Sequence, residues 1–130
     1  PDLPIDYYLE NYKSIFEHNM LYNMFLIAPQ TSDERIRKID SISKGFIYMV
    51  SSSSITGSKN SFSSEQINYF ERIEKMDLNT PRIIGFGVGN KETFNATVDY
   101  SKGAIIGSAF IKNLHENGID SIDSFIKSIR

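Results

Sequence analysis

The chain lacks cysteine and tryptophan altogether, and it has no long uninterrupted apolar run. Without cysteine there is no disulfide framework, no thiolate metal site and no cysteine nucleophile, and the absence fits a cytoplasmic protein. No apolar stretch approaches the roughly 18 residues that a membrane helix needs. The chain opens on Pro1 with no signal-peptide pattern. It also lacks an initiator Met, so we expect its start to be a processing or cleavage point.

An excess of charge of one sign is also missing. The 14 basic and 16 acidic side chains leave a net charge of −2 among 130 residues. They are dispersed, which excludes a broad basic surface for nucleic acid. His18 and His115 are expected at the surface near helix ends, and no metal-ligand spacing, catalytic triad or dinucleotide motif is found. With 40% hydrophobic residues, the chain is globular and long enough for one domain or part of one.

Apolar runs alternate with amphipathic segments along the whole chain, which predicts an α/β fold with a parallel sheet. Capping boxes are expected at Thr31 with Glu34 and at Ser63 with Gln66, and single caps at Asn90 and Asp120. Phe94 and Val98 are expected to face inward. The four predicted strands are residues 20–28, 46–50, 82–88 and 104–107, and the helices are 4–17, those starting near 31, 63 and 90, then 108–114 and one from 120.

Two of these predicted strands are followed by glycine and then by a predicted helix, at Gly85-Phe86-Gly87 and at Gly107-Ser108. Glycine lets backbone N–H groups approach a ligand, and the helix that follows directs the positive end of its dipole there. A glycine also serves any tight turn, so one corner alone is weak evidence. Two successive corners favour a phosphate site, which in a (β/α)8 barrel follows the seventh and eighth strands.

The ordered set of short segments resembles the tryptophan synthase alpha subunit. The resemblance implies a (β/α)8 TIM barrel of which residues 1–130 form a single partial domain, the C-terminal half with strands five to eight and their helices. The segments are Asp2-Leu3-Pro4, Phe25-Leu26-Ile27-Ala28-Pro29, Thr31-Ser32-Asp33-Glu34-Arg35-Ile36, Gly45-Phe46-Ile47-Tyr48, Ile55-Thr56-Gly57, Gly85-Phe86-Gly87, and 103–109, Gly-Ala-Ile-Ile-Gly-Ser-Ala.

The resemblance further implies a lyase of tryptophan biosynthesis that cleaves indole-3-glycerol phosphate to indole and glyceraldehyde 3-phosphate without a cofactor. The partner would be the beta subunit, which holds pyridoxal phosphate, in an alpha2-beta2 heterotetramer. The cleavage needs two carboxyl groups for proton transfer. In the family these are a Glu and an Asp of the N-terminal half, so the 130-residue segment alone is predicted to be inactive.

The residues expected to act are those that match the family. Gly57, Gly87, Gly107 and Ser108 would bind the phosphate. Leu26, Tyr48, Phe86 and Ile105 would line the indole pocket, with Tyr48 and Thr56 supporting the catalytic acids of the other half. Ser52 and Ser54 depart from the family pattern, because Arg and Gly are usual there, which puts loop closure and beta-subunit coupling in doubt.

Three interpretations stay open from the sequence. The chain is the binding half of this lyase, or a non-catalytic half-barrel that binds phosphate or a partner, or part of another phosphate-binding barrel. The pairing of Ile55-Thr56-Gly57 with Gly85-Phe86-Gly87 disfavours the third. Four parallel strands alone would leave raw sheet edges and an exposed apolar face, so the half is not expected to be a well-behaved monomer.

Overall fold

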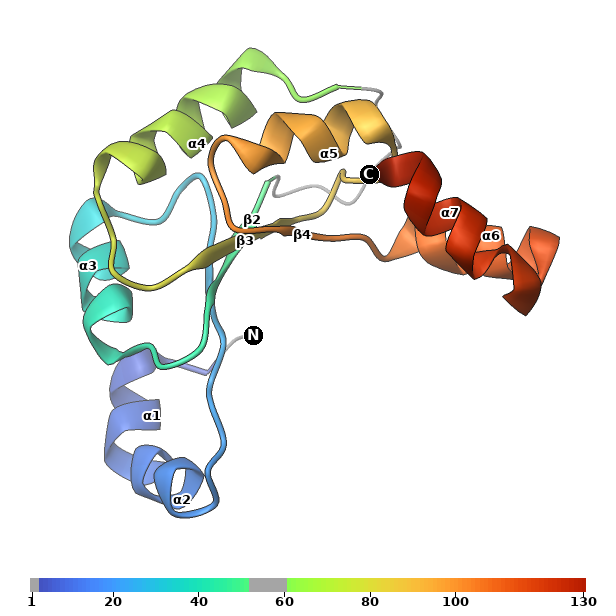
Figure 1. Ribbon diagram of the computed structural model, residues 1–130. Helices are drawn as coiled ribbons and strands as arrows, with labels where there is room; N and C mark the ends of the chain where they lie inside the picture. Colours follow the sequence, from blue (N-terminus) through green and yellow to red (C-terminus); the bar gives the residue numbers. More distant parts are fainter. Residues whose placement is uncertain (1–2, 52–60) are drawn as a thin grey trace.

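The computed structural model describes residues 3–51 and 61–130, and its four strands form one parallel sheet in the order β1-β2-β3-β4. The predicted α/β alternation is therefore confirmed (Figure 1). The elements are α1 (Ile5–Asn11), α2 (Lys13–His18), β1 (Phe25–Ile27), α3 (Asp33–Ile42), β2 (Ile47–Val50), α4 (Ser64–Lys75), β3 (Arg82–Gly85), α5 (Lys91–Val98), β4 (Ala104–Ile105), α6 (Ser108–Asn117), the 3-10 turn η1 (Ile119–Ser121) and α7 (Ile122–Ile129).

One face of the sheet is packed under helices. Ile27 pairs in register with Met49, and Met49 with Ile84, so the three side chains form a row on that face. All three are buried, and Figure 1 shows α3, α4 and α5 over the same side of the strands. The rest of the described core includes Ile36 and Ile39 of α3 and Phe70 and Ile73 of α4.

The opposite face of the sheet carries side chains that are only partly covered. Leu26, Tyr48 and Ile83 form the next row by register, and each is half-buried. Ile105 of β4 is 38% exposed. Parallel sheets normally have both faces covered. A one-sided parallel sheet with free edges at β1 and β4 is the geometry expected of half a closed barrel.

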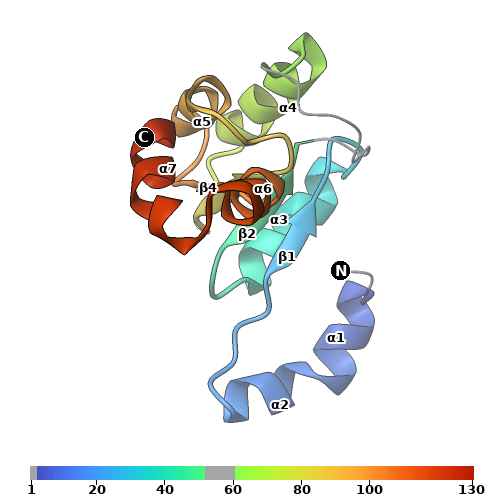
Figure 2. The same ribbon diagram turned by 90° about the vertical axis from the view of Figure 1, so that its right-hand side faces the viewer.

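The predicted N-terminal helix is broken at Tyr12, which has φ −122° and ψ −24° and separates α1 from α2. The break lets Tyr8 pack edge-on against both Phe16 and Phe25, with ring centroids 5.6 and 5.4 Å apart. Aromatic packing therefore overrides a helical periodicity that runs through both segments. The two short helices stand away from the sheet in Figure 2.

Helix caps were predicted with mixed success. Ser63 with Gln66 forms the expected capping box, and Asn90 caps α5. Thr31 does not cap α3, because its hydroxyl instead accepts from Ala28 N at 2.9 Å. The cap is Ser32, whose hydroxyl accepts from Arg35 N at 3.3 Å.

The C-terminal expectations also need correction. Asp120 makes no side-chain cap, because the turn η1 intervenes before α7 and neither has a capping side chain. Val98 does not face inward, as it is the last residue of α5 and 54% exposed. The strands are shorter than predicted, since the apolar runs of the sequence extend beyond the residues that pair in the sheet.

The open sheet face predicts self-association of the 130-residue chain. Apolar surface and two unpaired edges favour burial against a second copy or aggregation. Light scattering coupled to gel filtration should therefore give a mass above the 14.8 kDa of one chain. A monodisperse, cooperatively melting monomer would contradict this expectation.

Asp40 connects α3 to the start of β3. Its carboxylate accepts from Thr80 N at 2.8 Å and from Asn79 N at 3.1 Å. Burial opposes ionisation, but the hydrogen bonds from Thr80 and Asn79 outweigh it and hold the pKa of Asp40 below its usual value. Because this folded-state pKa is lowered, the carboxylate stabilises the fold above the unfolded pKa of about 3.9 and ceases to as pH falls through the folded value.

Asp40→Ala should therefore lower the free energy of unfolding by about 1–3 kcal/mol at pH 7. Urea unfolding at fixed protein concentration would measure the loss, which should shrink as the pH falls through the lowered folded-state pKa and the wild-type carboxylate is protonated. Asp123→Ala is the matched control, since Asp123 makes only an exposed pair with Lys127 and its loss should cost under about 0.5 kcal/mol. Equal losses for the two variants would be inconsistent with the bonding described.

Candidate functional site

The corners after β3 and β4 lie next to each other. Gly85 and Ile105, the last residues of the two strands, are paired in register. Gly87 and Gly107 each lie two residues further on. A Cβ atom built on Gly89 would be 3.3 Å from the Cβ of Ala109 in α6, so the two corners are in close contact. The two predicted phosphate corners therefore lie side by side at the carboxyl ends of β3 and β4.

The glycines of the first corner are explained by the chain itself. A Cβ on Gly85 would lie 2.3 Å from the hydroxyl of Tyr48, whose ring occupies that space. Gly87 has φ +81°, a left-handed conformation that favours glycine, and Phe86 before it also has a positive φ of 64°. Neither glycine therefore needs a ligand to account for it.

Gly107 differs from both. Its φ is −100°, which any residue can adopt, and a Cβ built on it would meet nothing within 4 Å. Nothing in the described chain thus calls for glycine here. The helix that follows, α6, begins at Ser108 without a side-chain cap, whereas α3, α4 and α5 are capped by Ser32, Ser63 and Asn90. An uncapped helix start with open space beside it suits an anion.

An aromatic pair stands beside these corners. The rings of Tyr48 and Phe86 are stacked with centroids 5.9 Å apart and an interplanar angle of 16°. Leu26 neighbours Tyr48 across the β1–β2 pairing. Burial raises the pKa of the Tyr48 hydroxyl, so it stays protonated at neutral pH and can donate a hydrogen bond. The open face of the sheet carries Leu26, Tyr48 and Ile105. The Phe86 ring packs on Tyr48 there, and 40% of the Phe86 surface is exposed.

Several expected site residues lie outside the described residues. These are Thr56 and Gly57, together with the unusual Ser52 and Ser54. The described corners therefore hold Gly87, Gly107 and Ser108 of the four expected phosphate ligands.

The four strands carry no Asp or Glu. Within residues 3–51 and 61–130, no group of three or more His, Asp and Glu side chains is placed to hold a metal ion. In the same ranges, no helix is long and apolar enough to cross a membrane. The described open face can hold an apolar ring and an anion, but it offers no carboxyl group for proton transfer.

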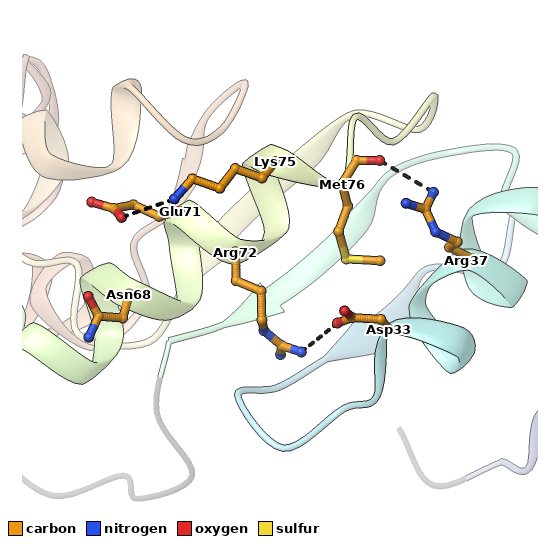
Figure 3. A pocket seen from close by; sticks show the side chains of 7 residues that line it. All are labelled: Asp33, Arg37, Asn68, Glu71, Arg72, Lys75 and Met76. Carbon is orange, nitrogen blue, oxygen red and sulfur yellow. Dashed lines mark hydrogen bonds and ion pairs between the residues drawn. The ribbon is translucent and has the colours of Figure 1, made fainter.

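A hollow lies elsewhere, between α3 and α4 on the outer side (Figure 3). Its volume is about 570 Å³. Arg72 pairs with Asp33 at 2.7 Å and donates to the carbonyl of Pro29, and Arg37 donates to the carbonyl of Met76. Because these guanidinium groups already join the two helices, we interpret the hollow as part of the packing between α3 and α4 rather than as an anion site.

Sequence reasoning missed Ser51. This side chain is fully buried, and its hydroxyl donates to the carbonyl of Phe86. Ser51 follows β2 directly, at the start of a serine run whose sequence does not mark Ser51 as buried. The only available signal was its position at the carboxyl end of a strand.

Comparison with known proteins gives a consistent result. The family model described as tryptophan synthase alpha chain matches residues 1–129. The tryptophan synthase alpha chain of Flavobacterium psychrophilum is 64% identical over 129 residues, which are 99% of this chain and 51% of that protein. The one from Flavobacterium johnsoniae is 61% identical over 130 residues, 100% of this chain and 51% of that protein.

A solved structure agrees with these relatives. The chain superposes on the tryptophan synthase alpha subunit of Campylobacter jejuni with a TM-score of 0.80 and 26% identity, covering 100% of this chain and 52% of that one. The chain thus spans about half the length of the relatives it matches, and that half is the C-terminal part. With the family match over almost every residue and four parallel strands that form half a barrel, the chain belongs to the tryptophan synthase alpha chain family.

Proposed function

We propose that this chain is the substrate-binding half of a lyase that cleaves indole-3-glycerol phosphate to indole and glyceraldehyde 3-phosphate. In this role the corners after β3 and β4 bind the phosphate, and the open sheet face holds the indole ring. The family membership supports the reaction, and the geometry of the two corners supports the division of labour between the halves.

The observation that carries the proposal is the environment of Gly107. The glycine has an ordinary φ and open space around it, beside a helix start that no side chain caps. A phosphate lying against Gly107 would accept from the first N–H groups of α6 and from the Ser108 hydroxyl. A side chain at position 107 would occupy the space of the phosphate, and this explains why the residue is glycine.

The indole ring would lie on the open face between Leu26, Tyr48, Phe86 and Ile105. The stacked Tyr48 and Phe86 rings offer an aromatic surface next to the phosphate corner. In the cleavage, the bond between the indole ring carbon and the side chain breaks, the ring carbon gains a proton, and the side-chain hydroxyl loses one to become the aldehyde. Both proton transfers need carboxyl groups, which we assign to the part of the protein that this chain does not include.

Other parts of the assignment stay predictions. These are the beta-subunit partner with its pyridoxal phosphate, the heterotetramer, the cofactor-free reaction, the cytoplasmic location and the roles of Thr56 and Gly57. The absence of acids from the four strands also favours a second candidate, a half-barrel that binds phosphate or a partner without catalysis. Activity measurements on a completed protein separate the two candidates.

The phosphate site predicts a large effect of Gly107→Val. A side chain there should weaken glycerol 3-phosphate binding about tenfold or more, because it fills the space next to the α6 N–H groups, and tenfold corresponds to about 1.4 kcal/mol. Isothermal titration calorimetry would measure the affinity in residues 1–130 joined behind the N-terminal half of the Flavobacterium psychrophilum alpha chain. Gly103→Val is the control, since position 103 also has no atom within 4 Å of a built Cβ but precedes β4 at the other end of the sheet. Unchanged affinity in Gly107→Val would refute the assignment.

The division of labour predicts that residues 1–130 release no indole alone. Joining them behind the N-terminal half of the Flavobacterium psychrophilum alpha chain, which we call the completed chain, should restore lyase activity. Indole release from indole-3-glycerol phosphate would be followed by colorimetry. A completed chain that folds and binds glycerol phosphate but releases no indole would favour the non-catalytic candidate.

A further inference from the structure

We propose that Ser51 is a positioning residue for the indole pocket, whose buried hydroxyl holds the Phe86 carbonyl and thereby sets the Phe86 ring against Tyr48. This inference rests on the proposed function for its effect on ligand binding. It concerns one hydrogen bond between the ends of β2 and β3.

Ser51 continues the pairing of β2 with β3 beyond the strands. Its amide donates to the carbonyl of Gly85 at 3.1 Å, and its hydroxyl donates to the carbonyl of the next residue, Phe86. The residue is fully buried. One residue therefore fixes two successive carbonyl groups where the strand turns into the glycine corner, the first through its amide and the second through its hydroxyl.

The Phe86 backbone needs such a support. Its φ of 64° is uncommon for a residue other than glycine, asparagine or aspartate, and it is disfavoured for a bulky side chain. Residues in such conformations persist only when their surroundings over-determine them. The observed backbone places the ring in a stack with Tyr48, 40% exposed on the face where the indole would lie.

Gln66 in turn holds Ser51. Its carboxamide nitrogen donates to the Ser51 carbonyl at 3.0 Å, while its oxygen accepts from Ser63 N at 2.8 Å within the capping box. A chain of hydrogen bonds thus runs from the first turn of α4 through Ser51 to Phe86. Gln66 therefore both caps α4 and, through Ser51, supports the proposed position of Phe86 in the indole pocket.

The effect of Ser51 should be selective for one half of the substrate. Gly107 and Ser108, the proposed phosphate ligands of the corner after β4, make no described contact with Ser51. Gly87, the proposed ligand of the corner after β3, lies closer, because a Cβ built on it would be 3.6 Å from the Ser51 hydroxyl. Removing the hydroxyl would leave the Phe86 carbonyl without its donor and allow the ring to leave Tyr48. Indole affinity should therefore fall more than phosphate affinity, because two of the three described phosphate ligands are remote from Ser51, and a merely structural role would not produce this difference.

The test uses the completed chain with indole and glycerol 3-phosphate as separate probes in calorimetry. Ser51→Ala should weaken indole binding about fivefold, as expected for a lost buried hydrogen bond, and change glycerol 3-phosphate binding by less than about twofold. The ring-current shift of the Tyr48 protons should decrease in the NMR spectrum. Ser101→Ala is the matched control, because it removes a hydroxyl that donates to Thr97 and Gly103 carbonyls near the other end of the sheet.

A second variant guards against misfolding of the first. Gln66→Glu keeps an N3 acceptor for the capping box but removes the donor to the Ser51 carbonyl, so it should lower indole affinity in the same selective way. If Ser51→Ala does not fold, Gln66→Glu decides.

The results that overturn the inference are specific. Equal weakening of both probes, or unchanged indole affinity together with an unchanged Tyr48 shift, would reject the positioning role while the proposed function stands. A wild-type completed chain that binds neither probe would reject the proposed function, and the inference with it.

Discussion

The alternation of side chains along the four parallel strands is the constraint on which the rest of the molecule depends. Because successive residues point to opposite faces, burying Ile27, Met49 and Ile84 under α3, α4 and α5 sends Leu26, Tyr48 and Ile83 to the other side. A shift of register by one residue would exchange core and pocket. The apolar core of the half-barrel and the proposed substrate surface are therefore two consequences of one pairing.

The glycine corners illustrate how similar sequence features can have different physical causes. Gly85 is small because the Tyr48 ring occupies the place of its side chain, and Gly87 because its φ is positive. Gly107 has neither reason. Among these three, only Gly107 combines open space with an uncapped helix start and so points toward a ligand, and a sequence pattern of glycine after a strand cannot distinguish the three.

Much of the architecture could be predicted from the sequence. Long periodic segments and local caps such as Ser63 with Gln66 specified the α/β alternation, because their signals lie within a few residues. The break at Tyr12 and the choice of Ser32 over Thr31 were missed, since both depend on contacts with Phe25 and Ala28 that form only in the fold. Within the site, the expected residues came from family resemblance, whereas Ser51 needed the structure because nothing in the sequence around it marks this serine as buried.

The strand order has a consequence for how such a protein forms. Each strand pairs with the strand next to it along the chain, and the described sheet contains no pairing that skips one. Each pairing still has to close a crossover that contains a helix, and parallel pairing across such connections forms slowly. The sheet can thus grow one strand at a time, and each new edge stays unpaired until the following crossover closes.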